Sequence, residues 1–216
     1  MSTWISKGLF AGALLALAAC ADGIEMGLGA AGQEMVRDAP DRVVVTGDRV
    51  IVAGPPGYCI DGSATRDTGN AAFVLLGSCA SISRDPAQPR PAVPGLLTVS
   101  VAPSSVESPD FSGQVDLLEA YVRSDEGRAA LSRRGAAADL EILETLTVDG
   151  ALYIHARDRS RVRGARIGNE YWRALMGVEG HLVTASVVSF ADQPMTREAG
   201  LELLDSLAQR LRGVNT

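Results

Sequence analysis

The densest group of functional side chains lies in HARDRSRVRGAR, residues 155–166. Four arginines alternate along it and would share one face of a β-strand, with a fifth close behind: Arg157, Arg159, Arg161, Arg163 and then Arg166. Guanidinium groups bind phosphates, anionic lipid head groups and acidic protein surfaces. The alternative is a solvated hairpin end, neutralised by Asp158 and by carboxylates on nearby strands.

Two aromatic residues, Tyr171 and Trp172, follow this segment in EYWR. Near the arginines they would form an aromatic and cationic surface of the kind that protein interfaces use. We therefore treat both, with the four alternating arginines, as candidate partner-binding residues. Packing of Trp172 in the core is the alternative interpretation.

The residue types that most often act as catalysts are sparse. The chain has two histidines. His155 and His181 fall in predicted strands that are not neighbours in a simple meander, so we expect structural roles for both. A nucleophile elbow requires G-x-S-x-G, and Gly77-Ser78-Cys79 lacks the second glycine. The sequence therefore assigns no catalytic residue.

Carboxylates are numerous, but their spacing does not distinguish a site from a solvated face. They fall on a predicted helix and on a predicted strand: Asp116, Glu119, Asp125, Glu126, Glu141 and Glu144. Phosphate-binding loops, dinucleotide fingerprints and HExxH are absent from the sequence. We expect no cofactor and no metal. A hydrolase that uses Asp, Glu or Ser remains the enzymatic alternative.

The first 20 residues carry a targeting pattern. Lys7 precedes an uncharged run from Gly8 to Ala19, which is shorter than the about 20 apolar residues of a membrane-spanning helix. The run ends in LAAC, residues 17–20, which resembles the lipobox of bacterial lipoproteins. The resemblance implies cleavage before Cys20 and acylation of its thiol. The alternatives are an ordinary signal cut after 16–18 and an uncleaved helix.

A lipid anchor of this kind holds a protein firmly on a membrane surface without spanning it, because two or more acyl chains bind the bilayer tightly. We therefore expect the protein in the bacterial cell envelope, facing the periplasm. The Gly- and Ala-rich segment 20–41 would be a flexible tether, and about 20 such residues span roughly 25 Å. Lys7 is the only lysine, so removal of residues 1–19 leaves 19 arginines against 26 carboxylates, a net charge of −7. This balance argues against nucleic acid as a general partner.

If Cys20 carries lipid, Cys59 and Cys79 remain in an oxidising compartment. An even number of cysteines there favours a disulfide, which would stabilise the fold by about 3 kcal/mol. A thiol-based function is the alternative, although a CxxC motif is absent.

Hydrophobic periodicity and turn residues predict the elements of one domain, 42–213. Hairpins are expected at Gly47-Asp48, Asp149-Gly150 and Glu179-Gly180. A strand buried on both faces is expected at 71–82 and another at 95–103. Between them lies a Pro-rich connector, 85–95, with a polyproline ligand as the alternative.

Two helices complete the pattern. The first lies in 108–135, is capped by Asp110 or Ser112, breaks at Gly127 and ends at Gly135. The second begins after Thr196, ends at Gly213 and carries one apolar stripe: Leu201, Leu204, Leu207, Ala208 and Leu211.

This order predicts an α+β fold, a twisted antiparallel sheet covered by two helices. The layout across 42–213 is similar to the PsbP-like α/β sandwiches, which implies an accessory or assembly role. The segments GYCID and FVLLGSC resemble small uncharacterised lipoproteins of alphaproteobacteria, which implies no activity. We therefore expect a lipid-anchored envelope protein that binds a protein partner without being an enzyme. A purely structural lipoprotein is the remaining alternative.

Overall fold

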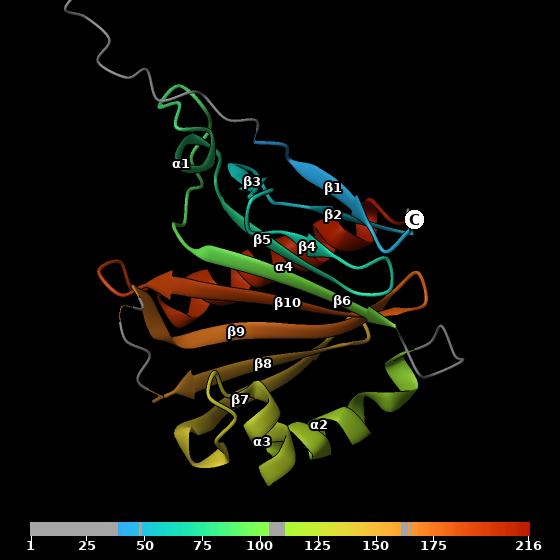
Figure 1. Cartoon of the computed structure of the whole chain (residues 1–216). Helices are drawn as coiled ribbons and strands as arrows, with labels where there is room; N and C mark the ends of the chain where they lie inside the picture. The colour runs from blue at the N-terminus through green and yellow to red at the C-terminus, as the bar shows by residue number, and fades with distance from the viewer. Residues whose placement is uncertain (1–38, 48, 104–110, 161–163, 165) are drawn as a thin grey trace, which may run out of the picture. The chain divides into compact units, whose positions relative to one another are not determined.

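The computed structural model describes residues 39–47, 49–103, 111–160, 164 and 166–216. Within these ranges the chain forms an eight-stranded antiparallel sheet in which seven strands follow the order β3-β5-β6-β10-β9-β8-β7 (Figure 1). The strands are β3 (Tyr58–Ile60), β5 (Ala72–Ser78), β6 (Leu96–Pro103), β7 (Leu140–Val148), β8 (Ala151–Asp158), β9 (Ile167–Val178) and β10 (His181–Phe190). The short β4 (Arg66–Asp67) pairs with β5, and β1 (Arg42–Val45) and β2 (Val50–Ala53) form a separate hairpin.

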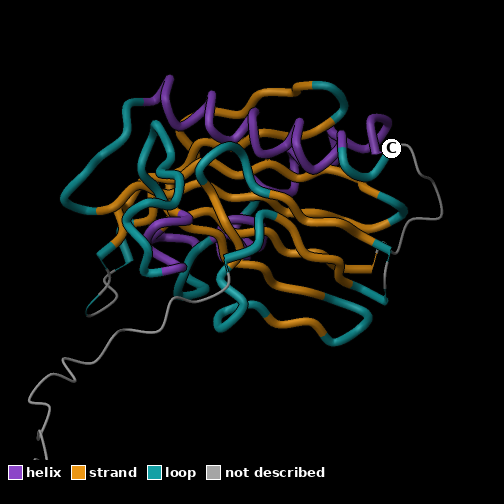
Figure 2. The backbone as a smooth tube through the Cα atoms, turned by 90° about the horizontal axis from the view of Figure 1, so that it is seen from above, coloured by secondary structure: helices purple, strands orange, loops and turns teal. Residues whose placement is uncertain are grey.

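The described helices are short except for the last one. They are α1 (Cys79–Ser83), α2 (Val115–Arg123), α3 (Asp125–Leu131) and α4 (Arg197–Gly213), with 3₁₀ turns at Phe111–Gln114 and Ala137–Asp139. Figure 2 shows α4 lying along one side of the strands. The predicted α+β class is confirmed. Among the described residues, no helix is both long enough and apolar enough to cross a membrane.

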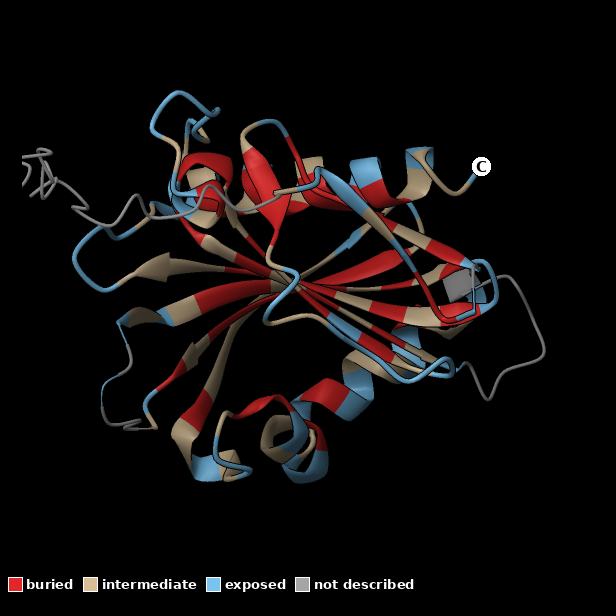
Figure 3. Cartoon of the chain, turned by 45° about the horizontal axis from the view of Figure 1, so that its top comes forward, coloured by how far each residue is buried: buried red, intermediate tan, exposed pale blue. Residues whose placement is uncertain are grey.

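Strand alternation gives the large sheet two different faces (Figure 3). The first face is apolar over most of β5, β6, β8, β9 and β10 and packs on α4 and on the β1–β2 hairpin. Fully buried residues there include Val74, Leu97, Val99 and Ala185, together with Leu204 of α4. On the second face, α2 and α3 pack mainly on β7, β8 and the start of β9, where Leu152, Ile154 and Tyr171 are buried with Val115 and Val122. Every core residue contributed by β5 and β6 belongs to the first face.

The three predicted hairpins are confirmed. Asp149-Gly150 and Glu179-Gly180 all have positive φ, between 46° and 73°, as two-residue turns of this type require. The first hairpin turns at Thr46 and Gly47, also with positive φ, while Asp48 lies outside the described residues. The predicted Thr196 cap is confirmed as well, because its side chain accepts a hydrogen bond from the Ala199 amide.

The predicted strand at 71–82 is wrong in its end and in its burial. Strand β5 stops at Ser78, and α1 begins at Cys79, whose amide donates to the Gly57 carbonyl (3.0 Å) as the chain leaves the sheet. Phe73 is 39% exposed. It lies on the second face, which α2 and α3 do not cover at this end of the sheet.

The predicted helix 108–135 breaks at Ser124 and not at Gly127. The Ser124 backbone is extended, and its hydroxyl accepts a hydrogen bond from the Gly127 amide (3.1 Å), which caps α3. Of the two predicted caps, Asp110 lies outside the described residues, and Gln114 occupies the cap position of α2 in place of Ser112. Gly213 is the last residue of α4, with Val214 at its cap.

The expected tether ends earlier than residue 41. The Pro40 carbonyl accepts a hydrogen bond from the Ile60 amide (2.7 Å), and the Asp41 carbonyl accepts one from the Gly54 amide (3.1 Å). These two residues therefore belong to the folded domain. Residues 20–38 of the predicted tether, including Cys20, and the targeting segment lie outside the described residues.

We predict that Gly127→Ala destabilises the protein because the new Cβ would lie 1.9 Å from the Tyr121 carbonyl oxygen, at the close junction of α2 and α3. Overpacking of this kind costs about 1–3 kcal/mol. The measurement is the free energy of unfolding from denaturant titration. Gly113→Ala is the matched control, because a Cβ there meets nothing within 4 Å. Equal stability of the two variants would contradict this account of the junction.

Candidate functional site

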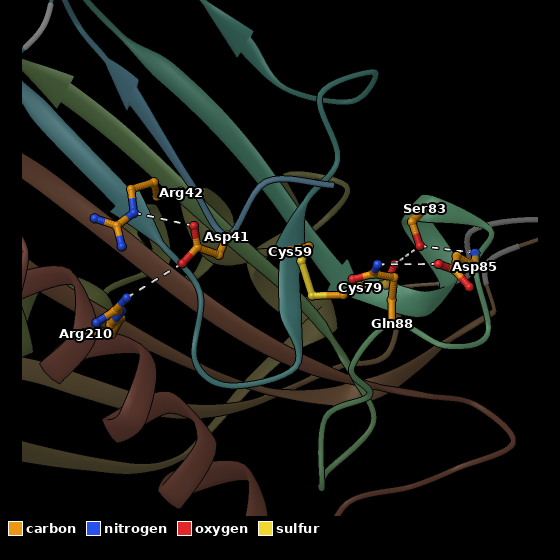
Figure 4. Close-up of a disulfide and its surroundings, with 8 residues drawn as sticks. All are labelled: Asp41, Arg42, Cys59, Cys79, Ser83, Asp85, Gln88 and Arg210. Atoms are coloured by element: carbon orange, nitrogen blue, oxygen red, sulfur yellow. Dashed lines mark hydrogen bonds and ion pairs between the residues drawn. A yellow bond between two sulfur atoms is a disulfide. The ribbon is translucent and has the colours of Figure 1, made fainter. Parts of the chain in front are cut away.

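The predicted disulfide is confirmed. Cys59 in β3 and Cys79 at the start of α1 are bonded, with their Cα atoms 4.8 Å apart (Figure 4). On the α1 side, the Ser83 hydroxyl donates to the Cys79 carbonyl (2.7 Å) and accepts from the Asp85 amide (3.2 Å). The disulfide and these bonds fix α1 against the edge of the sheet.

The Pro-rich segment 85–95 is a connector that returns over this edge, but it is not extended throughout, because the Gln88 amide donates to the Asp85 carbonyl (3.1 Å) and forms a turn. Its Pro89 carbonyl accepts a hydrogen bond from the Ala80 amide (3.2 Å), and its Val93 carbonyl accepts one from the Tyr58 hydroxyl (2.7 Å). Burial raises the pKa of Tyr58, so this hydroxyl stays protonated and remains a donor. Hydrogen bonds therefore attach the connector both to α1 and to β3, the two elements that the disulfide joins.

A cleft of about 680 Å³ lies between α1, this connector and the end of the sheet. Its floor belongs to the second face of the sheet, with Leu75 of β5 and Leu96 of β6. The walls come from α1 and the residue after it, the connector, the turn at 61–63, and the end of β10 with the chain that follows. In the same order they contribute these residues: Ser81, Ile82 and Arg84; Arg90 and Pro91; Asp61; Phe190 and Gln193. An apolar floor with polar groups at the rim is typical of a binding site.

Ser78 lines this cleft at the junction of β5 and α1, where a nucleophile elbow would place its serine. Its backbone is relaxed, with φ −54° and ψ 129°, and its buried Oγ has no hydrogen-bond partner among the described residues. His155 lies on β8, four strands away in the sheet order, roughly 19 Å at the usual strand spacing. His181 lies at the opposite end of its strand, paired with Pro103. Neither histidine is therefore placed to act as a base for Ser78.

A second hollow, of about 520 Å³, lies beside the same disulfide. Both cysteines line it, and its charged lining residues are Asp41 and Arg210, whose side chains lie 4.0 Å apart. This hollow therefore presents a compensated pair of charges.

Contrary to the prediction from the sequence, the four alternating arginines do not all lie on one face of a strand. Strand β8 ends at Asp158, so Arg159 lies beyond the ladder. Arg157 donates to Glu170 (2.7 Å) and to Glu141 (3.2 Å), and Arg159 pairs with the same Glu141. Carboxylates on β7 and β9 thus neutralise both arginines, while Arg161 and Arg163 lie outside the described residues.

Asp158 does not contribute to this neutralisation, contrary to the alternative considered for the hairpin end. It is buried, and its carboxylate accepts hydrogen bonds from the Arg133 amide (2.7 Å) and the Ser160 amide (2.8 Å). Burial raises the pKa of Asp158, but these backbone donors outweigh that effect and hold the pKa below its ordinary value.

The expected aromatic surface is not present at Tyr171 and Trp172, whose exposed fractions are 5% and 3%. Tyr171 lies under α3 on the second face, where its hydroxyl donates to the Leu131 carbonyl (3.0 Å). Trp172 lies on the first face under α4, and a Cβ on Gly200 would come within 2.7 Å of its ring. Strand alternation sends the two neighbouring rings to opposite cores. Core packing, the alternative for Trp172, therefore applies to both.

His155 stacks on Trp172, with ring centroids 4.5 Å apart and planes 4° apart. Its Nε2 lies 3.4 Å from a Glu170 oxygen. Burial lowers the pKa of His155, and the nearby charges act in both directions: Glu170 and Glu144 raise it, and Arg197 and Arg157 lower it. The ring therefore favours its neutral form.

Comparisons of the chain with protein-family models, with curated protein sequences and with solved structures found no match. The resemblances to the lipobox and to the PsbP-like layout accordingly remain predictions. In the described part of the chain, no three side chains among His, Cys, Asp and Glu are grouped so that they could hold a metal ion.

The sequence did not identify the cleft, because its lining comes from four separate segments. One available signal was the proline run that follows Cys79, since such a connector must fold back over α1 to begin β6. Arg173, a charged side chain in the otherwise apolar strand YWRALMGV, was also not singled out from the sequence. One charged residue within this apolar run indicated an unusual position.

We predict that the free energy of unfolding falls as the pH is lowered through about 6.5, the ordinary pKa of histidine. The folded-state pKa of His155 is depressed, so the unfolded chain binds the proton first and is favoured at lower pH. His155→Phe keeps an aromatic ring on Trp172 and should flatten this slope between pH 7.5 and pH 5. His181→Phe, the control at the other histidine, should retain it, and an unchanged slope in His155→Phe would exclude His155 as its source.

Proposed function

We propose that the chain is a lipid-anchored protein of the bacterial cell envelope and that its domain binds a ligand or partner without catalysing a reaction. Support for the anchor is the LAAC pattern at residues 17–20, after a short apolar run led by Lys7. Support for the compartment is the Cys59–Cys79 disulfide, because such bonds persist where exported proteins reside.

The observation that carries the binding role is the cleft of about 680 Å³ beside α1. Its volume lies within the range of about 300–1,000 Å³ that is usual for ligand sites. Leu75, Ile82 and Leu96 supply apolar surface, and Ser81, Arg90 and Gln193 supply polar groups around it.

Binding is favoured over hydrolysis by the distribution of the titratable groups. Among the described residues that line the cleft, Asp61 is the single carboxylate, and its Oδ1 accepts hydrogen bonds from the Ser63 amide (2.9 Å) and the Ser63 hydroxyl (2.5 Å). A hydrolase of the kind considered above needs two converging carboxylates or a base beside its serine. Glu141, Glu144 and Glu170 instead pair with arginines on the other face of the sheet.

For the anchor, we predict that Cys20→Ser moves the protein from the membrane fraction to the soluble fraction of the envelope. The serine cannot accept the thioether-linked lipid, so the hydrophobic contribution of the acyl chains is lost. Fractionation and intact mass measure the change. The double variant Cys59→Ser/Cys79→Ser is the control and should remain with the membrane. Membrane retention of Cys20→Ser equal to wild type would contradict the anchor.

For the cleft, we predict that a photo-reactive phenylalanine analogue at Ser81 forms an adduct of defined mass in living cells. The same group at the exposed Glu126 of α3 should not form it. Adding Leu75→Arg, which places a charge on the apolar floor, should remove the adduct. Intact mass spectrometry gives the readout. An identical adduct pattern at both positions, or none at Ser81, would contradict a binding role for this cleft.

A further inference from the structure

Arg173 differs from Arg157, the other half-buried arginine in the described strands of the sheet, because no ion pair joins it to a carboxylate. Its Nε donates to the Ser186 hydroxyl (3.0 Å), and its guanidinium carbon lies 4.9 Å from the centre of the Tyr171 ring. Among the described residues, no ion pair and no further hydrogen bond satisfies the two terminal nitrogens. Burial lowers the pKa of Arg173, which means that the fold disfavours the charge that this side chain carries.

The charges around Arg173 do not compensate for it. Arg133 adds a second positive charge, and its guanidinium donates to the Gly168 carbonyl (2.7 Å). Asp158 is the one carboxylate that favours the charged form of Arg173, and both of its oxygens accept backbone amides. The local balance of these three groups is one net positive charge, which is complementary to an anion.

The register connects Arg173 to the cleft. On the second face, Arg173 of β9 lies beside Ser186 of β10, Ser186 lies beside Thr98 of β6, and Thr98 lies beside Leu75 of β5. Leu75 is the cleft floor. Three strand spacings of about 4.8 Å separate the two ends of this row, roughly 14 Å.

The row between the two ends carries hydroxyl groups. Thr98 and Ser186 are half-buried, and the main contacts of α2 and α3 with the sheet are with β7 and β8. The neighbouring row on the same face adds Ser100 and Thr184, beside the exposed Phe73. An elongated ligand can therefore lie across the strands, with hydroxyl groups below it and apolar surface at the cleft end.

We propose that Arg173 binds the carboxylate or phosphate group of an amphiphilic anion whose apolar part extends along the Ser186–Thr98 row into the cleft. A guanidinium with two free terminal nitrogens is suited to bidentate binding of either oxyanion. The proposal deepens the proposed function, because it names the class of ligand for the same cleft. It also explains why an uncompensated arginine is kept on a face that is otherwise apolar or hydroxyl-lined.

The test is calorimetric titration of the full chain carrying Cys20→Ser, so that no acyl anchor competes for the apolar end. The probes are octanoate, octyl phosphate, inorganic phosphate and 1-octanol. We expect at least one octyl anion to bind at least tenfold more tightly than 1-octanol and than inorganic phosphate. Comparison of the two octyl anions distinguishes a carboxylate ligand from a phosphate ligand.

Arg173→Met should weaken binding of that anion at least tenfold, while the matched variant Arg166→Met, at an exposed arginine, should stay within twofold of wild type. Without ligand, Arg173→Met should unfold at the same or a higher denaturant concentration, because it removes a half-buried charge that lacks an ion-pair partner. A lower unfolding midpoint would show a structural role and overturn the proposal. Unchanged anion affinity in Arg173→Met, or failure of both octyl anions to bind, would also overturn it.

These outcomes are independent of the Ser81 cross-linking result. If the adduct forms in the cleft while Arg173→Met binds the anion as wild type does, the binding role stands and the ligand class is wrong. If the octyl anion binds through Arg173 while no adduct forms in cells, the anion site stands and the proposed role of the cleft fails.

Discussion

The packing of α4 against the first face of the sheet is the interaction on which the other parts of the domain depend. Leu204, Leu207 and Leu211 are fully buried there together with residues of β2, β6, β9 and β10. At about 25 cal/mol per Å² of apolar surface, burial of this kind is the main favourable term in folding. The chain end strengthens it, because the Asn215 side chain both accepts from the Ile51 amide and donates to its carbonyl (2.8 Å each), which joins β2 to the end of the helix.

The same arrangement leaves the second face incompletely covered. One long helix and a hairpin cover the first face, whereas α2 and α3 together are short and cover the second face mainly at β7, β8 and the start of β9. The strands at the opposite end carry threonine and serine on this face and leucine, valine and phenylalanine around them. The cleft and Arg173 both lie on this half-covered surface, so the open part of the sheet is where the chain can bind a molecule without disturbing its core.

Local signals in the sequence predicted the elements well. Asp149-Gly150 and Glu179-Gly180 specify their hairpins because two-residue turns demand particular backbone angles, and Thr196 specifies the start of α4 through its own hydroxyl. The disulfide followed from the expected compartment. The break between α2 and α3 was misplaced because a glycine is a conspicuous breaker, whereas Ser124 acts through a capping bond that competes with helix continuation. Tyr171 and Trp172 were misjudged because the side on which each ring is buried depends on which helices cover which face.

The candidate sites were harder to predict from the sequence than the helices and strands, because they depend on the register between strands that are distant in the chain. Nothing in the chain order places Leu75 on the same row as Arg173, since 97 intervening residues form most of the sheet between them. The charge distribution is likewise a tertiary result. Arg157 and Arg159 looked functional in the sequence and are paired with glutamates, while Arg173 looked like one charge in a strand and lacks an ion-pair partner. A half-buried charge without an ion-pair partner opposes folding, and the oxyanion proposed to bind at Arg173 would supply that partner.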